Sequence, residues 1–573
     1  AYAPNRYRRV QMNTASLNDA PTKGWVCSSL KGVPLHCIIF RTAADPCMGS
    51  GHILVYAFDV LIDIYTACGW SERDAAKSIL RNNLYGLDID RRAYQLAYFA
   101  VMMKARQYNR RILSAENQPN LANFADVMHV NTSLLSGSLR KFAEQFQFAD
   151  TYGSLMTVTK SAGLDEAVSA FLPTFGMQAE QLEMMMRVAR ILTQKYDVVC
   201  TNPPYMGGSG MNATLSDFIK KNYPDYKSDL FSAFVIKCTK MAKLEGYLGF
   251  LTPYVWMFIQ SYEKMRNYIY STRTIETLIQ FEYSAFEEAT VPICTIVLKN
   301  SKVRKNGAYL TLTEFRGGME VQRQKALEAI SNHKCGFYYE SNAENFSKIP
   351  GSPVAYWVSE NFVRAFDGKK VGNYLNCRSG IMTGSDEFIK QWYEVNYNNI
   401  KFNCKTAKDM LDYKWFPLNS GGEFRKWYGN NSKIVNLQND GAKIKATVKN
   451  FRLREKTFYF KRGITWGRIT SSKIAFRDVI QGSLFGDAGP IGFIEENRNY
   501  LLGFLCSNVS LFCLQATNPT LNYQVRDIES EPLILSVGHL PLVNKKVQEN
   551  IDLSKADWDS FETSWDFEGH PLV

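Results

Sequence analysis

The sequence predicts an α/β protein in which a doubly wound parallel sheet precedes a mixed α+β region. Apolar, strand-like runs alternate with amphipathic helical runs until about residue 345, as in a parallel sheet covered by helices. From about Ile349 the chain has short strands, many aromatics, Gly and Asn turns and an excess of basic residues. We therefore expect a poorly defined segment 1–35, a sheet domain 36–345, a basic domain 346–541 and the start of a further region 542–573.

The composition is typical of a globular chain with several domains. It has 573 residues, of which 46% are hydrophobic and 21% are charged. No apolar run reaches the ~20 residues that a membrane-spanning helix needs, and we expect no signal peptide. The 12 cysteines form no CxxC pair and the 6 histidines are dispersed, so neither a metal site nor a disulfide framework is indicated. We expect a cytoplasmic protein with no metal and no membrane contact.

The first strand-and-helix unit carries the motif DPCMGSGHILV, Asp45–Val55. A short strand is expected at residues 37–40, with Arg41–Ala44 interrupting it before the motif. The small-residue turn Gly49–Gly51 then leads into an amphipathic helix. Such a turn lets the backbone approach a ligand closely, and Asp45 beside it is placed to meet the ammonium of an amino-acid group. The motif lacks GxGxxG spacing, so a dinucleotide is not favoured.

The next two predicted strands also end near carboxylates. The run LYGLDIDRRAY places Asp88 at a strand end, where carboxylates bind ribose hydroxyls in such sheets. Asp88 is the better candidate and Asp90 the second, with the alternative that one of them only caps the following helix. A third strand is expected within Leu121–Val130, with Asp126 or Asn131 near the base of the ligand.

The central motif is YDVVCTNPPYMGG, Tyr196–Gly208. Its first residues are mostly apolar, as in a buried parallel strand. The two prolines cannot continue the sheet, because each lacks an N–H and has its φ fixed. The loop is therefore stiff, and it projects Asn202 and Tyr205 from the carboxyl end of a strand, where open α/β sheets bind ligands.

A stiff loop of this composition suits methyl transfer to an exocyclic amino group of a base. Such a nitrogen is a poor nucleophile while its lone pair is delocalised into the ring. The Asn202 side-chain oxygen and the Pro203 carbonyl can each accept one of its N–H groups, which localises the lone pair and aims it at a methyl donor. Tyr205 offers a ring face on which the base stacks. The alternative is an ordinary strand-to-loop turn.

Further helices and strands follow the loop. Ser228 or Asp229 is expected to cap a helix that Gly246 ends. Strands are expected at Tyr247–Thr252 and at Ile293–Leu298.

The positive charge is concentrated in the second region. Residues 361–480 contain 23 Lys and Arg against 10 Asp and Glu, a net charge of +13 in a chain whose total is +12. Basic charge confined to one region is typical of a nucleic-acid-binding module, with a solvated basic surface as the alternative. Aromatic residues are interleaved with the basic ones, as on surfaces that contact phosphates and read bases. The candidate DNA contacts are Arg425, Lys426, Lys461, Arg462 and Arg468.

Together, the motifs DPCMGSGH, LYGLDID and NPPY resemble those of the amino-group DNA methyltransferases in which the cofactor motif precedes the catalytic one. NPPY among these indicates N6-adenine methylation. From about Asp45 onward the chain is similar to the PglX family of BREX phage-defence methyltransferases. The runs that carry this likeness are DPCMGSGHILVYAFDVL, NPPYMGGSGMN, SDLFSAFVIKC, GYLGFLTPYVWM, FEEATVPICTIVLKN, NPTLNYQVRDIESEPLI and DWDSFETSWDFEGHPLV.

The resemblance implies a Rossmann-like methyltransferase sheet that uses S-adenosylmethionine, followed by a target recognition domain for double-stranded DNA. Other proteins of a BREX system are further candidate partners. The implied catalytic residues are Asn202, Pro203, Pro204 and Tyr205, with Phe286 stacking on the adenine opposite Tyr205. The implied cofactor contacts are Asp45, Pro46, Gly49, Ser50, Gly51, Asp88 and Asp126.

The sequence departs from the family at both ends. We find neither its N-terminal domain nor its Thr-Pro-containing helix before Asp45, and the family continues past Val573. Two other functions stay open. One is an N-methyltransferase that acts on protein glutamine, against which the basic region argues. The other is a specificity subunit that binds cofactor and DNA with little turnover.

Overall fold

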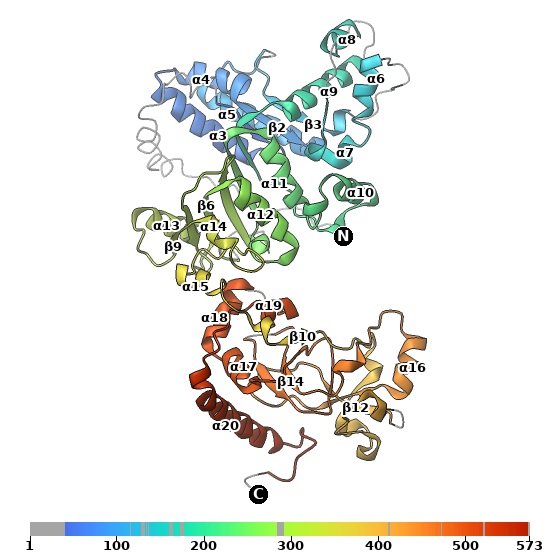
Figure 1. The fold of residues 1–573 in the computed structure, drawn as a ribbon. Coiled ribbons are helices and arrows are strands. Elements are labelled where there is room, and N and C mark those ends of the chain that lie inside the picture. The colour runs from blue at the N-terminus through green and yellow to red at the C-terminus, as the bar shows by residue number, and fades with distance from the viewer. Residues whose placement is uncertain are drawn as a thin grey trace. The chain divides into compact units, whose positions relative to one another are not determined.

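The computed structural model describes residues 41–570 with internal gaps. The gaps are 115, 128–131, 133, 134, 136, 160–163, 172–176, 284–290, 411, 412, 471, 472 and 519–521. The described chain divides into two compact units (Figure 1). Unit 1 contains the residues up to Val255 and Asn267–Ser341, and unit 2 contains Trp256–Arg266 and the residues from Asn342 onward.

Unit 1 is built on a nine-stranded sheet with the strand order β3-β2-β1-β4-β5-β7-β6-β8-β9. Its strands are β1 (Ala43–Asp45), β2 (Leu84–Asp88), β3 (Asn120–Asn123), β4 (Tyr196–Thr201), β5 (Ala242–Pro253), β6 (Thr274–Gln280), β7 (Ile293–Lys299), β8 (Gly307–Thr311) and β9 (Tyr338–Ser341). The strands from β3 to β5 run parallel. Because the chain leaves β1 toward β2 and leaves β4 toward β5, the order reverses between β1 and β4. Open α/β sheets bind ligands at such a reversal.

Helices cover both sides of the parallel strands (Figure 1). The helices of unit 1 are α3 (His52–Ala67), α4 (Glu72–Ser78), α5 (Arg91–Tyr108), α6 (Gly137–Glu144), α7 (Ala149–Tyr152), α8 (Leu164–Phe171), α9 (Met177–Thr193), α10 (Ala213–Asn222), α11 (Leu230–Met241) and α13 (Gly318–Ser331), while α12 (Glu263–Thr272) crosses the boundary between the units. One apolar cluster joins α3, α4 and α5 to the start of the sheet, and a second joins α10 and α11. The predicted α/β class is therefore confirmed.

Three local expectations are wrong. The sheet is mixed, because β7 pairs antiparallel with both β5 and β6; an apolar pattern does not encode strand direction. Ala43 and Ala44, expected to interrupt a strand, instead begin β1, which is paired on both sides; Arg41 and Thr42 precede it. The expected strand at 37–40 lies outside the described residues. Gly246 does not end α11 but lies within β5, where a Cβ would meet the backbone oxygen of Asp197 at 2.8 Å.

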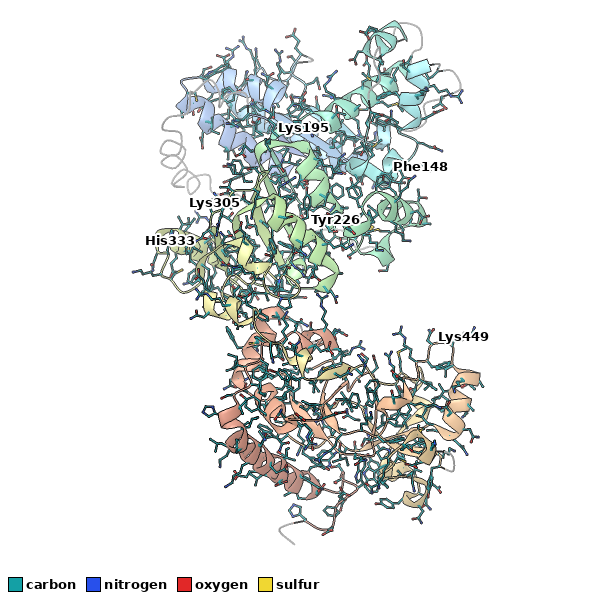
Figure 2. All side chains as sticks on the ribbon, in the orientation of Figure 1. Phe148, Lys195, Tyr226, Lys305, His333 and Lys449 are labelled. Carbon is teal, nitrogen blue, oxygen red and sulfur yellow. The ribbon has the colours of Figure 1, made fainter. Side chains whose placement is uncertain are left out.

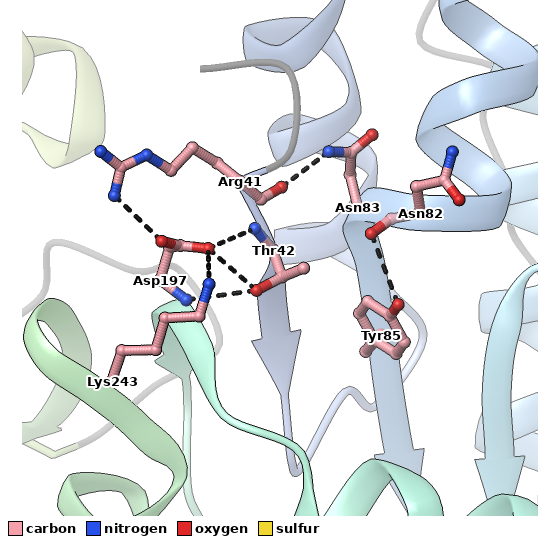
Figure 3. Close-up of polar contacts among 7 residues, drawn as sticks. All are labelled: Arg41, Thr42, Asn82, Asn83, Tyr85, Asp197 and Lys243. Carbon is pink, nitrogen blue, oxygen red and sulfur yellow. Dashed lines mark hydrogen bonds and ion pairs between the residues drawn. The ribbon is translucent and has the colours of Figure 1, made fainter. Parts of the chain in front are cut away.

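A polar network joins the amino ends of the central strands (Figure 3). Asp197 of β4 accepts hydrogen bonds from the Thr42 amide at 2.9 Å and from the Thr42 hydroxyl at 3.1 Å. Arg41 and Lys243 donate to the same carboxylate at 2.9 and 2.8 Å. Thus one side chain holds the entries of β1, β4 and β5 together.

Unit 2 is mixed α+β, as the sequence predicts. It contains two four-stranded sheets, β10-β17-β14-β15 and β11-β13-β12-β16. Its strands are β10 (Asn376–Arg378), β11 (Ile389–Gln391), β12 (Trp415–Asn419), β13 (Lys433–Asn436), β14 (Gly463–Trp466), β15 (Phe476–Val479), β16 (Leu484–Phe485) and β17 (Ile491–Phe493). Its helices are α14 (Ala343–Phe346), α15 (Glu360–Ala365), α16 (Gln438–Thr447), α17 (Arg498–Leu505), α18 (Asn508–Thr517), α19 (Val525–Glu529) and α20 (Leu540–Asp559).

The segment Trp256–Arg266 leaves the sheet after β5 and packs into unit 2. Arg266 is fully buried. Its guanidinium donates to the Ser352 carbonyl at 2.9 Å and to the Gly351 carbonyl at 2.6 Å. It also donates within its own segment to the carbonyls of Trp256 and Ile259. This residue therefore holds the segment against the start of unit 2.

Within the described ranges, no group of three or more His, Cys, Asp and Glu side chains is arranged to hold a metal ion. No single helix of those ranges has the length and apolarity to cross a membrane; the bent pair α17 and α18, which meet at 63°, reaches both only in combination.

Candidate active site

The first motif and the NPPY loop meet at the strand-order reversal. Asp45 ends β1 and is 1% exposed. Its Oδ1 accepts hydrogen bonds from the Cys47 amide at 3.0 Å and from the Thr201 hydroxyl at 2.7 Å. Thr201 is the last residue of β4 and directly precedes Asn202. This bond ties together two motifs that lie 156 residues apart.

Asp45 is an unusual carboxyl group. Its Oδ2 is buried and has no hydrogen-bond partner among the described residues. Burial raises the pKa of Asp45 to about 7; the bonds from Thr201 and Cys47 oppose this, and the nearby Asp88 adds to it. A buried carboxyl with a free oxygen suits a cationic ligand, because a positive charge there favours its ionised form.

The turn after Asp45 is closed on one side and open on the other. Gly49 and Gly51 have φ of +52° and +86°, which glycine adopts without steric cost. A Cβ on Gly51 would come within 3.0 Å of Ala97 in α5, whereas one on Gly49 would meet no atom within 4 Å. The open side of the turn therefore leaves room for a ligand over Gly49. The candidate residues Pro46 and Ser50 belong to the same turn.

Asp88 ends β2 and braces this turn. Its Oδ2 accepts the Gly49 amide at 2.9 Å and its Oδ1 accepts the Asp90 amide at 2.8 Å. Burial raises its pKa. Asp90 caps α5 by accepting the Arg92 amide at 2.6 Å, so the capping role falls to Asp90 and leaves Asp88 at the turn.

Asp126 lies just past β3, in a single turn of 3-10 helix, Ala125–Val127. Its carboxylate accepts from the Asn123 side-chain amide at 2.8 Å and pairs with Arg91 at 3.4 Å. These contacts hold it at the carboxyl edge of the sheet. The alternative Asn131 lies outside the described residues.

The NPPY loop leaves Asn202 exposed and Pro203 buried. The Tyr205 hydroxyl lies 2.9 Å from Asn202 Oδ1 and 3.1 Å from the Leu251 carbonyl oxygen, and it can donate to either. Tyr205 keeps 38% of its surface exposed. Pro204, between the buried proline and this ring, is exposed as well. The loop thus presents an amide oxygen and an aromatic face at the same edge.

Asp229 fixes the end of this loop. Its Oδ1 accepts the Met206 amide at 2.9 Å and the Phe231 amide at 3.2 Å, so it caps α11 and holds the loop at once. The Leu230 amide donates to the Met206 carbonyl at 3.1 Å. The ring of Tyr205 packs edge-on against Phe231, with centroids 6.3 Å apart.

Phe286, the predicted second stacking residue, lies outside the described residues. Four of the five candidate DNA contacts are engaged inside unit 2. Arg425 pairs with Asp557 at 2.8 Å, and Lys426 donates to the Cys506 carbonyl at 2.7 Å. Arg462 pairs with the buried Asp478 at 3.1 Å, and Arg468 pairs with Asp487. Lys461 is exposed beside the Phe458 ring, 5.8 Å from its centroid.

Sequence reasoning missed three supporting residues. Thr201 could have been predicted, because it is a hydroxyl residue at the last position of a predicted strand, where its side chain can reach the neighbouring motif. Asp229 was expected only as a helix cap, and its second bond to the loop has no local signal. Ser154, whose hydroxyl donates to the Pro46 carbonyl at 2.6 Å, comes from 108 residues away and could not be found from the pattern.

Sequence comparison places these motifs among known proteins. The Eco57I restriction-modification methylase family matches residues 82–286, which include the NPPY loop. The adenine-specific methyltransferase PglX of Lacticaseibacillus casei (strain Zhang) is 35% identical, over 93% of this chain and 47% of its own. The adenine-specific methyltransferase BrxX of Escherichia coli O9:H4 (strain HS) is 33% identical, over 92% and 46%.

By sequence, this chain belongs to the PglX/BrxX family. It spans about half the length of these curated relatives. The family resemblance expected from DPCMGSGH, LYGLDID and NPPY is thereby confirmed.

Solved structures support the fold. The Type IIL restriction-modification enzyme MmeI, in complex with DNA, has a TM-score of 0.53 at 11% identity, over 95% of this chain and 68% of that one. The Type ISP enzyme LlaGI, as a nuclease-deletion mutant with a DNA substrate mimic, has a TM-score of 0.50 at 12% identity, over 90% and 44%. This PglX/BrxX family member therefore shares its fold with these two proteins.

Proposed function

We propose that this chain is the catalytic part of a site-specific DNA adenine N6-methyltransferase that uses S-adenosylmethionine. The observation that carries this proposal is the 2.7 Å bond between Asp45 and Thr201, which brings the Gly-turn motif next to Asn202. A methyl donor held by one motif and an amino nitrogen held by the other would then lie close together.

The residues at the turn fit S-adenosylmethionine. The free buried Oδ2 of Asp45 suits the ammonium of its methionine part, and the open side of Gly49 leaves space for it. Asp88, which keeps acceptor capacity after two backbone bonds, suits its ribose hydroxyls. Asp126 at the end of β3 suits the edge of its adenine.

The NPPY loop would activate the target nitrogen by position. S-adenosylmethionine supplies an electrophilic methyl group. Asn202 Oδ1 and the Pro203 carbonyl would accept the two N–H groups of the flipped adenine and hold these hydrogens out of the ring plane, which localises the lone pair on the nitrogen. The Tyr205 ring stacks on the base, its hydroxyl held near the Asn202 and Leu251 oxygens. The N6 atom would form a bond to the methyl carbon as the bond from that carbon to the sulfonium sulfur breaks, which leaves the thioether S-adenosylhomocysteine, and the amino proton would then pass to solvent.

We assign the DNA to the basic unit 2, with its net charge of +13 over residues 361–480. Lys461 is exposed, and it is the candidate contact whose side chain forms neither an ion pair nor a hydrogen bond with another of the described residues. The likeness to PglX and BrxX further supports a role in a BREX-type defence system with other proteins of that system as partners.

Transfer of a labelled methyl group to duplex DNA tests the activity. The wild type should form N6-methyladenine on digestion to nucleosides, and Asn202→Ala should lose at least 100-fold in rate, by analogy with loss of a positioned polar group. Asn222→Ala, at the exposed end of α10, is the matched control and should keep wild-type activity.

The outcomes also separate the alternatives. Label in protein glutamine instead of DNA would indicate a protein methyltransferase. Binding of cofactor and DNA by the wild type without label transfer would indicate a specificity subunit. Equal activity of wild type and Asn202→Ala would refute the proposed role of the loop.

A further inference from the structure

Eight of the 23 basic residues at positions 361–480 of unit 2 form ion pairs with acidic side chains of the described residues. The pairs within this basic window or at its edges include Arg425–Asp557, Arg454–Asp487, Lys443–Glu387, Lys445–Asp440, Lys456–Asp440 and Arg462–Asp478. Among the cations without such a partner, a buried one is the more informative feature, because burial removes the solvent that would otherwise balance its charge.

Arg477 is such a cation. It lies in β15 and is 1% exposed. Its guanidinium donates to the Gly421 carbonyl at 3.1 Å and to the Arg425 carbonyl at 3.4 Å, while its Nε is buried without a partner among the described residues. No carboxylate of the described residues forms an ion pair with it. Burial lowers its pKa to about 10, and the neighbouring Arg425 contributes in the same direction.

A pocket of about 420 Å³ lies against Arg477. The exposed Lys473 also lines it, as do Gly422 and Gly467, which carry no side chain to fill it. Phe424 and Ile469 line it with 54% and 68% of their surface exposed. The exposed Glu423 is the acidic residue in its lining, against the two cations.

We propose that this pocket binds a backbone phosphate of duplex DNA, with Arg477 as the buried cation and Lys473 as the exposed one. The proposal rests on the proposed function, since it takes DNA as the partner of unit 2. A phosphate would balance the positive charge of Arg477, with which no carboxylate of the described residues pairs. A guanidinium also offers a phosphate several hydrogen-bond donors in one plane. Phe424 and Ile469 would contact the adjoining deoxyribose, which is apolar on its carbon face.

A phosphate contact has a different signature from a base contact. It adds affinity on every sequence, and losing it lowers the slope of log K against log salt by about one. The contact should therefore affect binding to recognition and unrelated duplexes equally. It should leave the methylated sequence unchanged.

Salt titrations of duplex binding test the pocket. Lys473→Gln removes an exposed charge, and Arg477→Met removes the buried one; circular dichroism and thermal unfolding check that both variants fold. Lys449→Gln is the matched control, because Lys449 is an exposed lysine of the same basic window that projects beyond α16 (Figure 2). We expect each pocket variant to lose about one unit of slope on both kinds of duplex, and the control to keep the wild-type slope.

Three results would overturn the inference. The first is a folded Lys473→Gln variant that keeps the wild-type salt slope. The second is a Lys449→Gln variant that loses as much slope as the pocket variants, which would indicate that the whole basic surface contributes equally. The third is a pocket that holds free phosphate only. Inorganic phosphate would then raise the unfolding temperature of the wild type but not of Arg477→Met, and Arg477→Met would bind DNA as the wild type does. If the wild type binds DNA in this way but transfers no methyl group, the proposed activity fails and the pocket stands. If it binds no duplex at all, both fail.

Discussion

Asp45 combines a raised pKa with an unpartnered buried oxygen, so ligand binding at this residue is linked to pH. With a folded-state pKa of about 7, the carboxyl of the ligand-free protein is mostly protonated below neutral pH. Only the carboxylate pairs with an ammonium. We therefore expect the Kd for S-adenosylmethionine to fall by up to about tenfold per pH unit between pH 5.5 and 7 and to level off above it. Calorimetry across this range would measure it.

The same residue makes a prediction for stability. Because the folded state holds a proton that the unfolded state releases above about pH 4, the ligand-free protein should lose stability as the pH rises from about 4 to 7. Asp45→Asn should lack both this slope and the pH dependence of cofactor binding. A pH-independent Kd in the wild type would contradict the assignment of Asp45.

At this scale, the sequence predicts residues whose roles are local. Asp45, Asp88 and Asn202 can be named as candidates because each lies at the end of a predicted strand, before a recognisable turn. The raised pKa of Asp45 cannot be predicted from the sequence, because it is caused by burial in the fold, which the hydroxyl of Thr201, 156 residues away, opposes only in part. Similarly, the sequence of residues 361–480 shows the positive charges but not their ion-pair partners. Arg462, which pairs with Asp478, therefore looks in the sequence like a side chain available to DNA.

The helix α11 and the NPPY loop share one side chain, Asp229, and that sharing is testable. Asp229→Ala removes a helix cap and the bond that holds the Met206 amide. Asn212→Ala removes the cap of α10, a bond of 2.8 Å to the Leu215 amide, without touching the loop. Both should lower the free energy of unfolding by about 1 kcal/mol.

Only Asp229→Ala should lower kcat for methyl transfer, by an order of magnitude or more, because a misplaced loop costs orientation. Denaturant unfolding and initial rates measure the two effects. Equal kcat values in the two variants would show that the loop is held by other contacts.

The network at Asp197 makes a prediction at the opposite end of the strands (Figure 3). Burial acts to raise the pKa of Asp197, but the bonds from Lys243 and Thr42 outweigh it and leave the pKa below its ordinary value. Its contribution to stability is therefore complete above the unfolded pKa, about 3.9, and is lost as the pH falls through the lower folded one. Asp197→Asn should cost about 1–3 kcal/mol at pH 7.

Chemical denaturation at several pH values checks this, and the difference from the wild type should shrink below about pH 4. Asp217→Asn is the control, since Asp217 forms an exposed pair with Lys220 in α10. It should change the free energy of unfolding by less than about 1 kcal/mol. A difference at Asp197 that persists unchanged at pH 3 would contradict the role of its charge.

Element positions were more predictable than element directions. Strands such as β2, β4 and β5 have apolar runs that the sequence shows, and they lie close to where they were expected. The direction of β7 and the existence of β1 depend on pairing with neighbouring strands, and a local sequence pattern does not predict which strands pair. In the sequence Gly246 resembles a helix end, because the constraint that requires a glycine there, the close backbone oxygens of other residues, comes from the tertiary structure.

The whole molecule contains separate hydrophobic cores in its two units. We expect calorimetric unfolding in two transitions, because domains with their own cores need not unfold together. S-adenosylmethionine at about 100 Kd should stabilise the transition of unit 1 by about 2.7 kcal/mol and leave the other unchanged. Asp45→Asn should lose this shift. A single unfolding transition, shifted as a whole by S-adenosylmethionine, would contradict this expectation.

The boundary between the units is the feature that the sequence hid most completely. Composition changes near Ile349, but Trp256–Arg266 lies far before that point in the sequence and belongs to unit 2. What assigns it there is the buried guanidinium of Arg266 on the carbonyls of Gly351 and Ser352.

This routing has a consequence for exchanging specificity between homologues. A graft that replaces everything after Ser341 would transplant only one of the two pieces of unit 2, leaving Arg266 of the recipient facing foreign carbonyls. A working chimaera should need the eleven-residue excursion Trp256–Arg266 from the donor as well. Recombination in nature meets the same requirement, so the two pieces should be inherited as a pair.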